Sequence, residues 1–240
     1  MRAPISIVIP TLNSQNTVRK TLASLFEGIE AGIVRELIVV DGGSTDQTRE
    51  IVEECGGKFI SSEASRGYQL RKGVNLAKGD FIFVLHSDSV LEPGWSEIVK
   101  KYFNKDAGYY CKLSFDIIHP LASMTSTWAN ARSLIFSLPY GDQGLLISRK
   151  LLMENGSYSP IPIMEDVELA LRFQGKLFRM PIVITTSSRK YRKNGWLRQG
   201  TKNIVRLLRF LLGADPNNLS DDYNRCLLYT SDAADEITGV

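Results

Sequence analysis

Short apolar runs alternate with amphipathic segments through the first third of the chain. Each run is three to five residues long, which is too short for most helices. The runs lie at 5–9, 37–40, 58–60 and 81–85. Between them, apolar residues recur with helical spacing after Ser14, after Ser44 and across Arg66–Ala77. This βαβαβαβ order predicts an α/β fold with a doubly wound, mostly parallel sheet flanked by helices.

Local signals predict where the first elements begin and end. Pro10 is expected to close the first strand after Ile9. Ser14 is expected to cap the first helix, and Ser44 with Gln47 has the spacing of a capping box for the second.

The rest of the chain is less regular. Helices are expected at about 94–103, 120–138 and 164–173, and strands at 109–115, 144–147 and 182–185. A C-terminal amphipathic helix is expected at 197–212. The length of 240 residues, with 43% hydrophobic and 23% charged residues, favours a single globular domain.

Positive charge concentrates late in the chain. From Arg189 to Arg209 there are eight Lys or Arg residues and no acid. The first four, at 189–193, are expected on a loop after the last strand. The other four recur on one face of the C-terminal helix, which could lie on an anionic membrane surface or dock on the core with a solvated basic face. Nucleic-acid binding is disfavoured because no aromatic stacking platform accompanies the charge.

Composition and the chain ends bear on location, redox chemistry and the extent of the folded domain. No window of about 18 continuous apolar residues and no signal peptide is present, so we expect a cytoplasmic protein. The three cysteines lie far apart, which argues against a disulfide framework or a zinc site. Residues 226–240 resemble a translated sequencing adapter and are excluded from the fold. Without their three acids, the formal net charge rises from +3 to +6.

Polar residues follow the apolar runs at positions where a parallel sheet binds ligands. The run Phe81–Leu85 ends in His86-Ser87-Asp88, and the second strand ends in the glycine-containing loop 40–46. Ligands of open α/β sheets bind outside the carboxyl ends of the strands, and free N–H groups of such a loop favour anions. His86 and Asp88 are therefore candidate ligand contacts, and the loop weakly indicates a nucleotide or phosphate.

Four segments together resemble the family 2 glycosyltransferases with the GT-A fold. They are the strand end Pro10-Thr11-Leu12-Asn13, the VVDGGSTD loop, the His86-Ser87-Asp88 strand end and Met164-Glu165-Asp166. The resemblance covers about residues 4–225. Within the family, Gly141-Asp142-Gln143-Gly144, Pro162–Asp166 and Ser188–Gly195 resemble a bacterial subgroup associated with radical-SAM and selenium-domain genes.

The resemblance implies an inverting enzyme that moves a sugar from a nucleotide-diphosphate sugar, most commonly a UDP-sugar, to a lipid-linked or small-molecule acceptor. Asp166 would be the catalytic base, beside Glu165. Asp88 would hold Mg²⁺ or Mn²⁺, as the last acid of the family's DxD motif. His86 replaces the first acid of that motif, so we interpret it as a group that hydrogen-bonds the ribose or orients the metal site. This replacement weakens the expectation of strong metal dependence.

The remaining implied contacts belong to the donor and the acceptor. Those expected to bind the nucleotide are Pro10, Thr11, Asn13, Asp41, Arg66, His86 and Asp88. Weaker candidates for acceptor or pyrophosphate contacts are Asp142, Gln143, Arg189 and Arg192. The implied domain, 1–225, divides into a nucleotide-sugar half (1–115), an acceptor and catalytic half (116–195) and a C-terminal helical segment (196–225).

Two other functions stay open at this point. A nucleotidyltransferase would be expected to carry a glycine-rich basic loop after the first strand, and Pro10–Ser14 has no glycine. A non-catalytic module that binds nucleotide or a membrane surface is compatible with His86 and with the basic helix.

Overall fold

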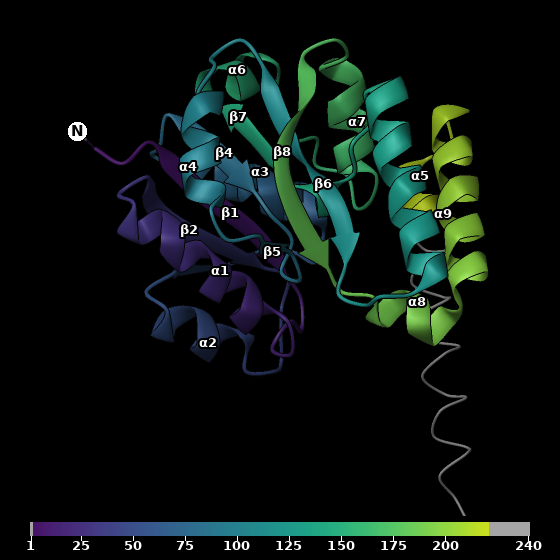
Figure 1. Cartoon of the computed structure of the whole chain (residues 1–240), viewed down its shortest axis with the longest axis horizontal. Coiled ribbons are helices and arrows are strands. Elements are labelled where there is room, and N and C mark those ends of the chain that lie inside the picture. The colour runs from purple at the N-terminus through teal and green to yellow at the C-terminus, as the bar shows by residue number, and fades with distance from the viewer. Residues whose placement is uncertain (1, 221–240) are drawn as a thin grey trace, which may run out of the picture.

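The computed structural model describes residues 2–220, and its centre is an eight-stranded mixed sheet in the order β3-β2-β1-β4-β7-β6-β8-β5 (Figure 1). The strands are β1 (Ile5–Thr11), β2 (Val34–Asp41), β3 (Lys58–Ser61), β4 (Phe81–Val84), β5 (Val90–Leu91), β6 (Gly108–Phe115), β7 (Leu145–Ser148) and β8 (Leu177–Thr186). The expected α/β fold is confirmed.

Strand direction explains where ligands can gather. β1 to β4 are mutually parallel, and β6 pairs in parallel with β8. Only β7 and β5 run the other way, because β7 is antiparallel to both β4 and β6 and β5 is antiparallel to β8. The carboxyl ends of six strands therefore share one edge of the sheet.

Helices cover both faces of the sheet. They are α1 (Val18–Glu30), α2 (Thr48–Glu54), α3 (Arg66–Leu76), α4 (Trp95–Val99), α5 (Pro120–Phe136), α6 (Arg149–Glu154), α7 (Glu165–Arg172), α8 (Arg189–Asn194) and α9 (Trp196–Leu211), with 3-10 turns η1 (Lys100–Tyr102) and η2 (Gly141–Gln143). One buried cluster packs α1, α2, α4 and α5 on one face, and a second packs α3, α6 and α7 on the other. In β1, Ile7 belongs to the first cluster and Val8 to the second, as the alternation of side chains along a strand requires.

Three predictions at element boundaries are wrong. β1 continues through Pro10 to Thr11, because only β2 pairs with it there and the pairing with β4 stops at Val8. Ser14 does not cap α1, which has Thr17 at its N-cap; the Ser14 hydroxyl instead lies 2.9 Å from that of Ser87.

The predicted capping box of the second helix is also absent. α2 starts at Thr48, and the Ser44 hydroxyl donates to Asp41 Oδ1 at 2.5 Å. Asp46 accepts the Thr48 backbone N–H at 3.0 Å instead. The carboxylates of Asp41 and Asp46 thus hold the loop by hydrogen bonds before the helix begins.

Several elements were not predicted or were predicted too short. β5 and α6 were missed, and β8 begins at Leu177 rather than Ile182. Residues 189–194 form the helix α8 where a loop was expected. The helix expected at 94–103 divides into α4 and η1.

The C-terminal helix α9 packs beside α5 at the side of the molecule far from α1 and α2 (Figure 1). Its one buried residue is Gln199, while Leu207 and Phe210 pack partly against the core. Leu197, Ile204, Val205, Leu208 and Leu211 all stay exposed. The apolar side of α9 is therefore only partly docked on the core, and much of it stays exposed.

Candidate active site

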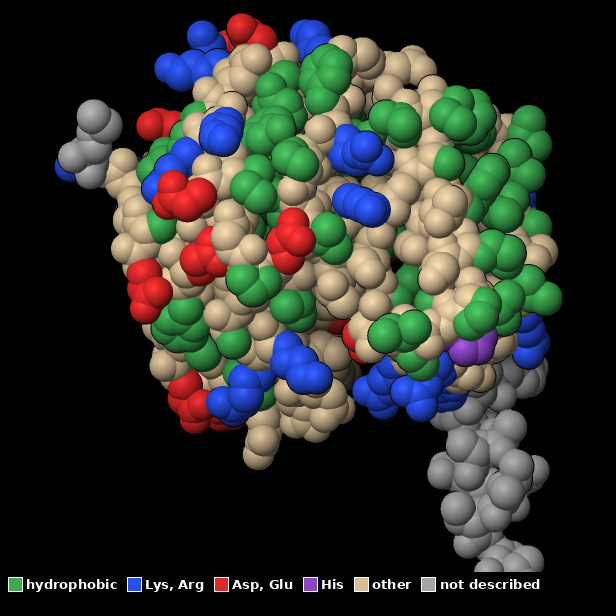
Figure 2. Space-filling view, in the orientation of Figure 1, with side chains coloured by type: hydrophobic (Ala, Val, Ile, Leu, Met, Phe, Trp, Pro, Cys, Tyr) green, Lys and Arg blue, Asp and Glu red, His purple; other side chains and the backbone are tan. Residues whose placement is uncertain are grey.

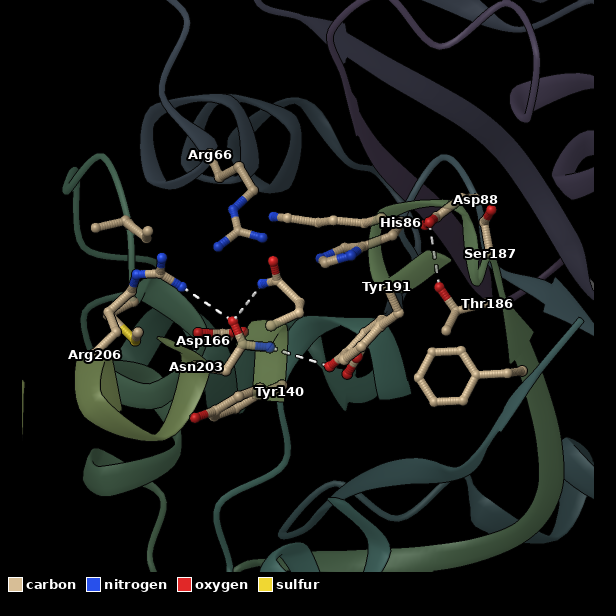
Figure 3. A pocket seen from close by; sticks show the side chains of 16 residues that line it. Arg66, His86, Asp88, Tyr140, Asp166, Thr186, Ser187, Tyr191, Asn203 and Arg206 are labelled. Atoms are coloured by element: carbon tan, nitrogen blue, oxygen red, sulfur yellow. Dashed lines mark hydrogen bonds between the residues drawn. The ribbon is translucent and has the colours of Figure 1, made fainter. Parts of the chain in front are cut away.

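Two adjacent cavities lie at the edge of the sheet where the six strands end. The inner one, of about 280 Å³, is lined by residues from β8, α3, α7, α8 and α9 and from the loops after β4 and around η2 (Figure 3). The outer one, of about 620 Å³, lies over the ends of β1 and β4. Arg66, His86, Asp88, Ser187 and Lys190 line both. The predicted position of the ligand site agrees with the position of these cavities.

The end of β1 forms one wall of the outer cavity, through Pro10, Thr11 and Asn13. Asn13 has a positive φ of 47°, and its Oδ1 accepts the Thr45 N–H at 3.0 Å. Asparagine tolerates this left-handed conformation better than most residues. The β1 end and the 40–46 loop are therefore tied together.

Asp41 holds the loop and does not line either cavity. Its Oδ1 accepts the Thr11 hydroxyl at 2.8 Å, and its Oδ2 accepts the backbone N–H groups of Gly43 and Ser44 at 2.9 and 2.6 Å. The residue is 2% exposed. Its contacts in this structure are thus with the loop that borders the cavity, and direct contact with a nucleotide stays a prediction.

Gln69 on α3 is a positioning residue that the sequence analysis missed. It is buried, and its Nε2 donates to the carbonyls of Thr11 and Val40, both at 2.8 Å. One side-chain amide therefore joins the carboxyl ends of two neighbouring strands. A lone glutamine in a helix carries no sequence signal for this role.

His86 lies at the junction of the two cavities. A Cβ at position 141 would overlap His86 Nε2, so only a glycine there lets η2 approach the imidazole. Burial lowers the pKa of His86, and the Arg66 guanidinium lowers it further, against the nearby carboxylates of Asp88 and Asp166. The imidazole is therefore favoured in its neutral form, which can donate and accept one hydrogen bond each.

Asp88 faces the same junction. Its Oδ2 accepts the Thr186 hydroxyl at 3.2 Å, across from the end of β8 (Figure 3). The described residues contain no group of three metal-ligating side chains. Mg²⁺, however, is commonly held by one or two carboxylates together with substrate phosphates and water. The donor set fits a divalent ion completed by a phosphorylated ligand, with Asp88 as its protein carboxylate.

Asp166 is the second residue of α7 and points into the inner cavity (Figure 3). Its Oδ2 accepts the Gly141 N–H at 2.7 Å, and its Oδ1 accepts the Val167 N–H at 2.8 Å. Met164, the residue before α7, has a φ of 65°, which turns the chain sharply where the helix starts. The carboxylate is therefore held in a fixed orientation by two backbone donors.

Glu165 lies behind Asp166 and outside the inner cavity. It is fully buried, with its Oε1 3.0 Å from Arg66 Nε. Burial raises the pKa of Glu165 to about 7, although the Arg66 guanidinium opposes the shift. In this structure Glu165 orients Arg66 from behind, and its predicted catalytic role would act through that arginine.

The weaker candidates around η2 differ from each other. Asp142 lines the inner cavity, and burial raises its pKa to about 6. Gln143 is fully buried: its Oε1 accepts the Ser133 hydroxyl at 2.5 Å, and its Nε2 donates to the Cys111 carbonyl at 3.3 Å. Gln143 therefore anchors η2 to β6 and α5, so the predicted contact with acceptor or pyrophosphate does not fit its position.

The basic segment contributes different residues from those expected. Arg189 lines the outer cavity, but Arg192 lines neither. Lys190 lines both cavities because α8 turns it inward, whereas the sequence analysis expected a loop here.

Two helix residues complete the inner wall and were also missed. Asn203 Nδ2 donates to the Tyr191 hydroxyl at 3.1 Å, and Arg206 donates to Asn203 Oδ1 at 3.2 Å (Figure 3). Asn203 and Arg206 lie three residues apart on α9, so the spacing alone places them on one face.

Comparison with known proteins finds a family model that matches more than half of the chain. The model described as Glycosyl transferase family 2 matches residues 6–140. An uncharacterized glycosyltransferase of Mycoplasma pneumoniae is 29% identical over 144 residues, which are 56% of this chain and 45% of that protein. Glucosyl-3-phosphoglycerate synthase of Mycolicibacterium smegmatis is 33% identical over 95 residues, 36% of this chain and 31% of that protein. The chain thus spans less than half the length of these relatives.

Solved structures share the fold at low sequence identity. Staphylococcus aureus TarS, residues 1–349, superposes with a TM-score of 0.58 at 20% identity and covers 88% of this chain and 66% of its own. Glucosyl-3-phosphoglycerate synthase of Mycobacterium tuberculosis, in complex with Mn²⁺, UDP and glucosyl-3-phosphoglycerate, superposes with a TM-score of 0.56 at 20% identity, covering 77% and 70%.

Proposed function

The chain belongs to the glycosyl transferase family 2, and we propose that it transfers a sugar from a nucleotide-diphosphate sugar to an acceptor hydroxyl with inversion at the anomeric carbon. The mixed α/β sheet with helices on both faces matches GT-A glycosyltransferase structures. The observation that carries the proposal is that Asp88 and Asp166 line one cavity at the carboxyl edge of the sheet. One carboxylate suits a diphosphate-bound cation and the other suits a general base.

The donor would occupy the outer cavity with its diphosphate at the junction. The nucleoside would lie along Pro10, Thr11 and Asn13, where the strand end leaves about 620 Å³. Arg66 and Lys190 line both cavities and carry the charge that a diphosphate requires. A UDP-sugar is favoured because the M. tuberculosis relative was solved with UDP.

A divalent cation, Mg²⁺ or Mn²⁺, would be held by Asp88 together with the diphosphate oxygens. When bound, such an ion neutralises the charge that develops on the departing diphosphate. Arg66 and Lys190 would share that task, and neutral His86 is placed to hydrogen-bond the donor beside Asp88. The expectation of metal use is therefore compatible with a histidine at the first position of the motif.

Asp166 would act as the general base. The acceptor oxygen forms the new bond to the anomeric carbon while its proton passes to the Asp166 carboxylate. The bond between the anomeric carbon and the diphosphate oxygen breaks, and its electron pair leaves with the nucleoside diphosphate. Backbone donors from Gly141 and Val167 hold the carboxylate in position for this transfer.

Donor binding is tested by isothermal titration of residues 1–225 with UDP, GDP and CDP, each with and without Mn²⁺. We expect one nucleotide to bind in a metal-dependent manner, and Asp88→Ala to abolish the metal dependence. If a folded protein bound none of the three, a donor site would be ruled out.

The base is tested by Asp166→Asn. We expect sugar transfer to fall by roughly 100- to 10,000-fold while nucleotide affinity stays within about threefold. Glu168→Gln is the matched control, since Glu168 lies on the same helix but pairs with Arg172 outside both cavities. Unchanged transfer in Asp166→Asn would remove this residue from the mechanism.

Two alternatives make different predictions. A non-catalytic nucleotide module would bind the nucleotide but release no sugar in any donor assay. A nucleotidyltransferase would release pyrophosphate rather than a nucleoside diphosphate. Membership of the glycosyl transferase family disfavours both.

We also propose a cytoplasmic location with peripheral membrane association through residues 197–212. No helix among residues 2–220 is long and apolar enough to cross a bilayer. Arg206 lines the inner cavity, so electrostatic attraction to a membrane would rest on Arg198, Lys202 and Arg209. The resemblance to the radical-SAM-associated subgroup stays a prediction, as does the non-native origin of 226–240, which lie outside the described residues.

A further inference from the structure

An apolar groove runs between α5 and α9 and shares four lining residues with the inner cavity. Its volume is about 560 Å³, within the usual range for sites that bind small molecules. Hydrophobic side chains gather on this side of the molecule (Figure 2). Trp128 and Phe136 of α5 line the groove opposite Ile204 and Leu208 of α9, and each of the four remains more than 40% exposed. A monomeric protein rarely leaves such a continuous apolar surface without a use.

The end of the groove is shared with the candidate active site. Tyr140, Asp142, Tyr191 and Asn203 line both the groove and the inner cavity. Arg206 adds a positive charge on the side of the inner cavity, where it donates a hydrogen bond of 3.2 Å to Asn203 Oδ1. A molecule lying in the groove would therefore have an apolar part along α5 and α9 and a polar end close to Asp166.

We propose that this groove binds the acceptor, and that the acceptor is an amphiphile with a hydrocarbon chain in the groove and a hydroxyl-bearing polar head in the inner cavity. This rests on the proposed glycosyltransferase activity. The outer cavity, on the other side of His86 and Asp88, is left to the donor. The head-group hydroxyl reaches Asp166 and attacks the anomeric carbon as described above, so the step balances with nucleoside diphosphate as the leaving group.

We favour an amphiphilic acceptor over other occupants because the groove shares lining residues with the cavity that holds Asp166. A second copy of the chain or another protein would cover the exposed faces of both helices, with no need for a passage to Asp166. A membrane surface would contact every exposed apolar residue of α9. An amphiphilic acceptor instead needs the residues that face the groove and not their neighbours. The two helices offer pairs of adjacent residues that separate these cases.

The first pair is Ile204 and Val205 on α9. Both are exposed, but only Ile204 lines the groove. The second pair is Phe136 and Ile135 on α5, of which only Phe136 lines it. Aspartate at the lining position should repel a hydrocarbon chain, whereas aspartate at its neighbour changes the same helix without reaching the groove.

Binding is measured with octyl, decyl and dodecyl β-glucoside below their micelle concentrations. Trp128 and Trp196 line the groove, so their fluorescence reports occupancy, while Trp95 is in the core. We expect affinity to rise roughly three- to fourfold per added methylene until the groove is filled. Ile204→Asp and Phe136→Asp should weaken dodecyl glucoside binding at least tenfold, and Val205→Asp and Ile135→Asp by less than twofold.

Transfer provides the second measurement. With a donor accepted by the wild type, kcat/KM for dodecyl glucoside should exceed that for glucose at least tenfold, and Ile204→Asp should remove this preference. Nucleotide affinity should be the same in all four variants, which separates failure of the groove from failure of the donor site.

Three results would overturn the inference. The first is a glucoside affinity that does not change with alkyl chain length. The second is an equal loss of binding in both variants of each pair, as a membrane face or a protein partner would give. The third is equal kcat/KM for glucose and dodecyl glucoside. If the wild type bound the glucosides as expected but bound no nucleotide, the proposed function would fail instead.

Discussion

Gly141 shows how a single residue type can decide the geometry of the site. Its N–H donates to Asp166 at 2.7 Å, and its missing side chain leaves room for His86. One backbone position thus orients the proposed base and lets the imidazole approach. The structure thus explains two residues of the motif Gly141-Asp142-Gln143-Gly144. Gly141 allows the close approach of His86, and Gln143 anchors η2.

We expect Gly141→Ala to move His86 or η2 and so to impair both nucleotide binding and transfer. The reason is overlap of the new methyl with His86 Nε2, and a shift of about 1 Å at such a site can cost about 100-fold in rate. Steady-state kinetics and UDP titration measure the effect. Gly200→Ala is the control for UDP binding, because Gly200 lies outside the inner and outer cavities and a methyl group there meets open space. A fully active Gly141→Ala would show that the site adapts easily.

Glu165 makes the stability of the fold depend on pH. Its carboxyl is fully buried, and its pKa is raised to about 7 in the folded state from an ordinary value of 4.5. The folded protein therefore binds more protons than the unfolded chain between these values, so the free energy of unfolding falls as pH rises through that window. Ionisation of this group costs roughly 3 kcal/mol at most.

We expect Glu165→Gln to flatten this pH dependence. Asp142, whose pKa is raised to about 6, also lowers the free energy of unfolding as pH rises to that value. The slope of unfolding free energy against pH between 4.5 and 7 should therefore decrease rather than vanish. Urea unfolding at several pH values measures it. A slope identical to that of the wild type would mean that Glu165 is ionised throughout the range.

At the scale of elements, α3 is held against the loop before α7. Gly67 N donates to the Ile161 carbonyl at 3.2 Å, and a Cβ at Gly67 would overlap the carbonyls of Ser159 and Ile161. Together with the Arg66–Glu165 contact, this joins the donor wall to the helix that carries Asp166. The two halves of the site therefore depend on one close approach.

Gly67→Ala should destabilise the protein by about 1–3 kcal/mol, since backbone atoms must shift to admit the methyl. Gly200→Ala should instead stabilise α9 by up to about 1 kcal/mol, because alanine is the better helix former. Thermal and denaturant unfolding compare the two. Equal stability in both variants would argue against a rigid contact at Gly67.

Elements covered on both faces were the easiest to predict from sequence. The run at 81–85 matches β4, where all four residues are buried. Asp88 and Asp166, both named from the sequence, line one cavity, and their roles stay predictions. Direction was not predictable, because nothing in Leu145–Ser148 records that β7 runs against its neighbours. Cap assignments failed because other partners take the expected capping hydroxyls: Ser87 across the fold for Ser14, and Asp41 in the same loop for Ser44.

The wall formed by Asn203 and Arg206 could not be found from the pattern of charges. Positive residues at helical spacing fit a solvated face, a membrane face or a cavity wall equally well. Only the packing of α9 beside α5 decides that Arg206 faces the inner cavity. Likewise, the two apolar faces become one groove only when the helices are side by side.

At the scale of the whole molecule, the two buried clusters of the described residues 2–220 extend from Ile5 to Leu219. We therefore propose that residues 1–225 form the folded domain, and expect this fragment to unfold at the same Tm as the whole chain. Calorimetry of both forms measures this. A markedly lower Tm in the fragment would mean that 226–240 belong to the fold.

The reversed strand β7 has a consequence for synthesis on the ribosome. It lies between β4 and β6, so the hydrogen-bonding edge of β4 stays open until residue 148 has emerged. That edge belongs to Phe81–Val84, a fully buried apolar strand of the kind that pairs with other chains when left uncovered. A nascent chain of about 140 residues would thus carry three of the four segments that resemble the family and still be prone to aggregate. We expect a fragment ending at residue 140 to require a chaperone, whereas the chain that includes β7 does not.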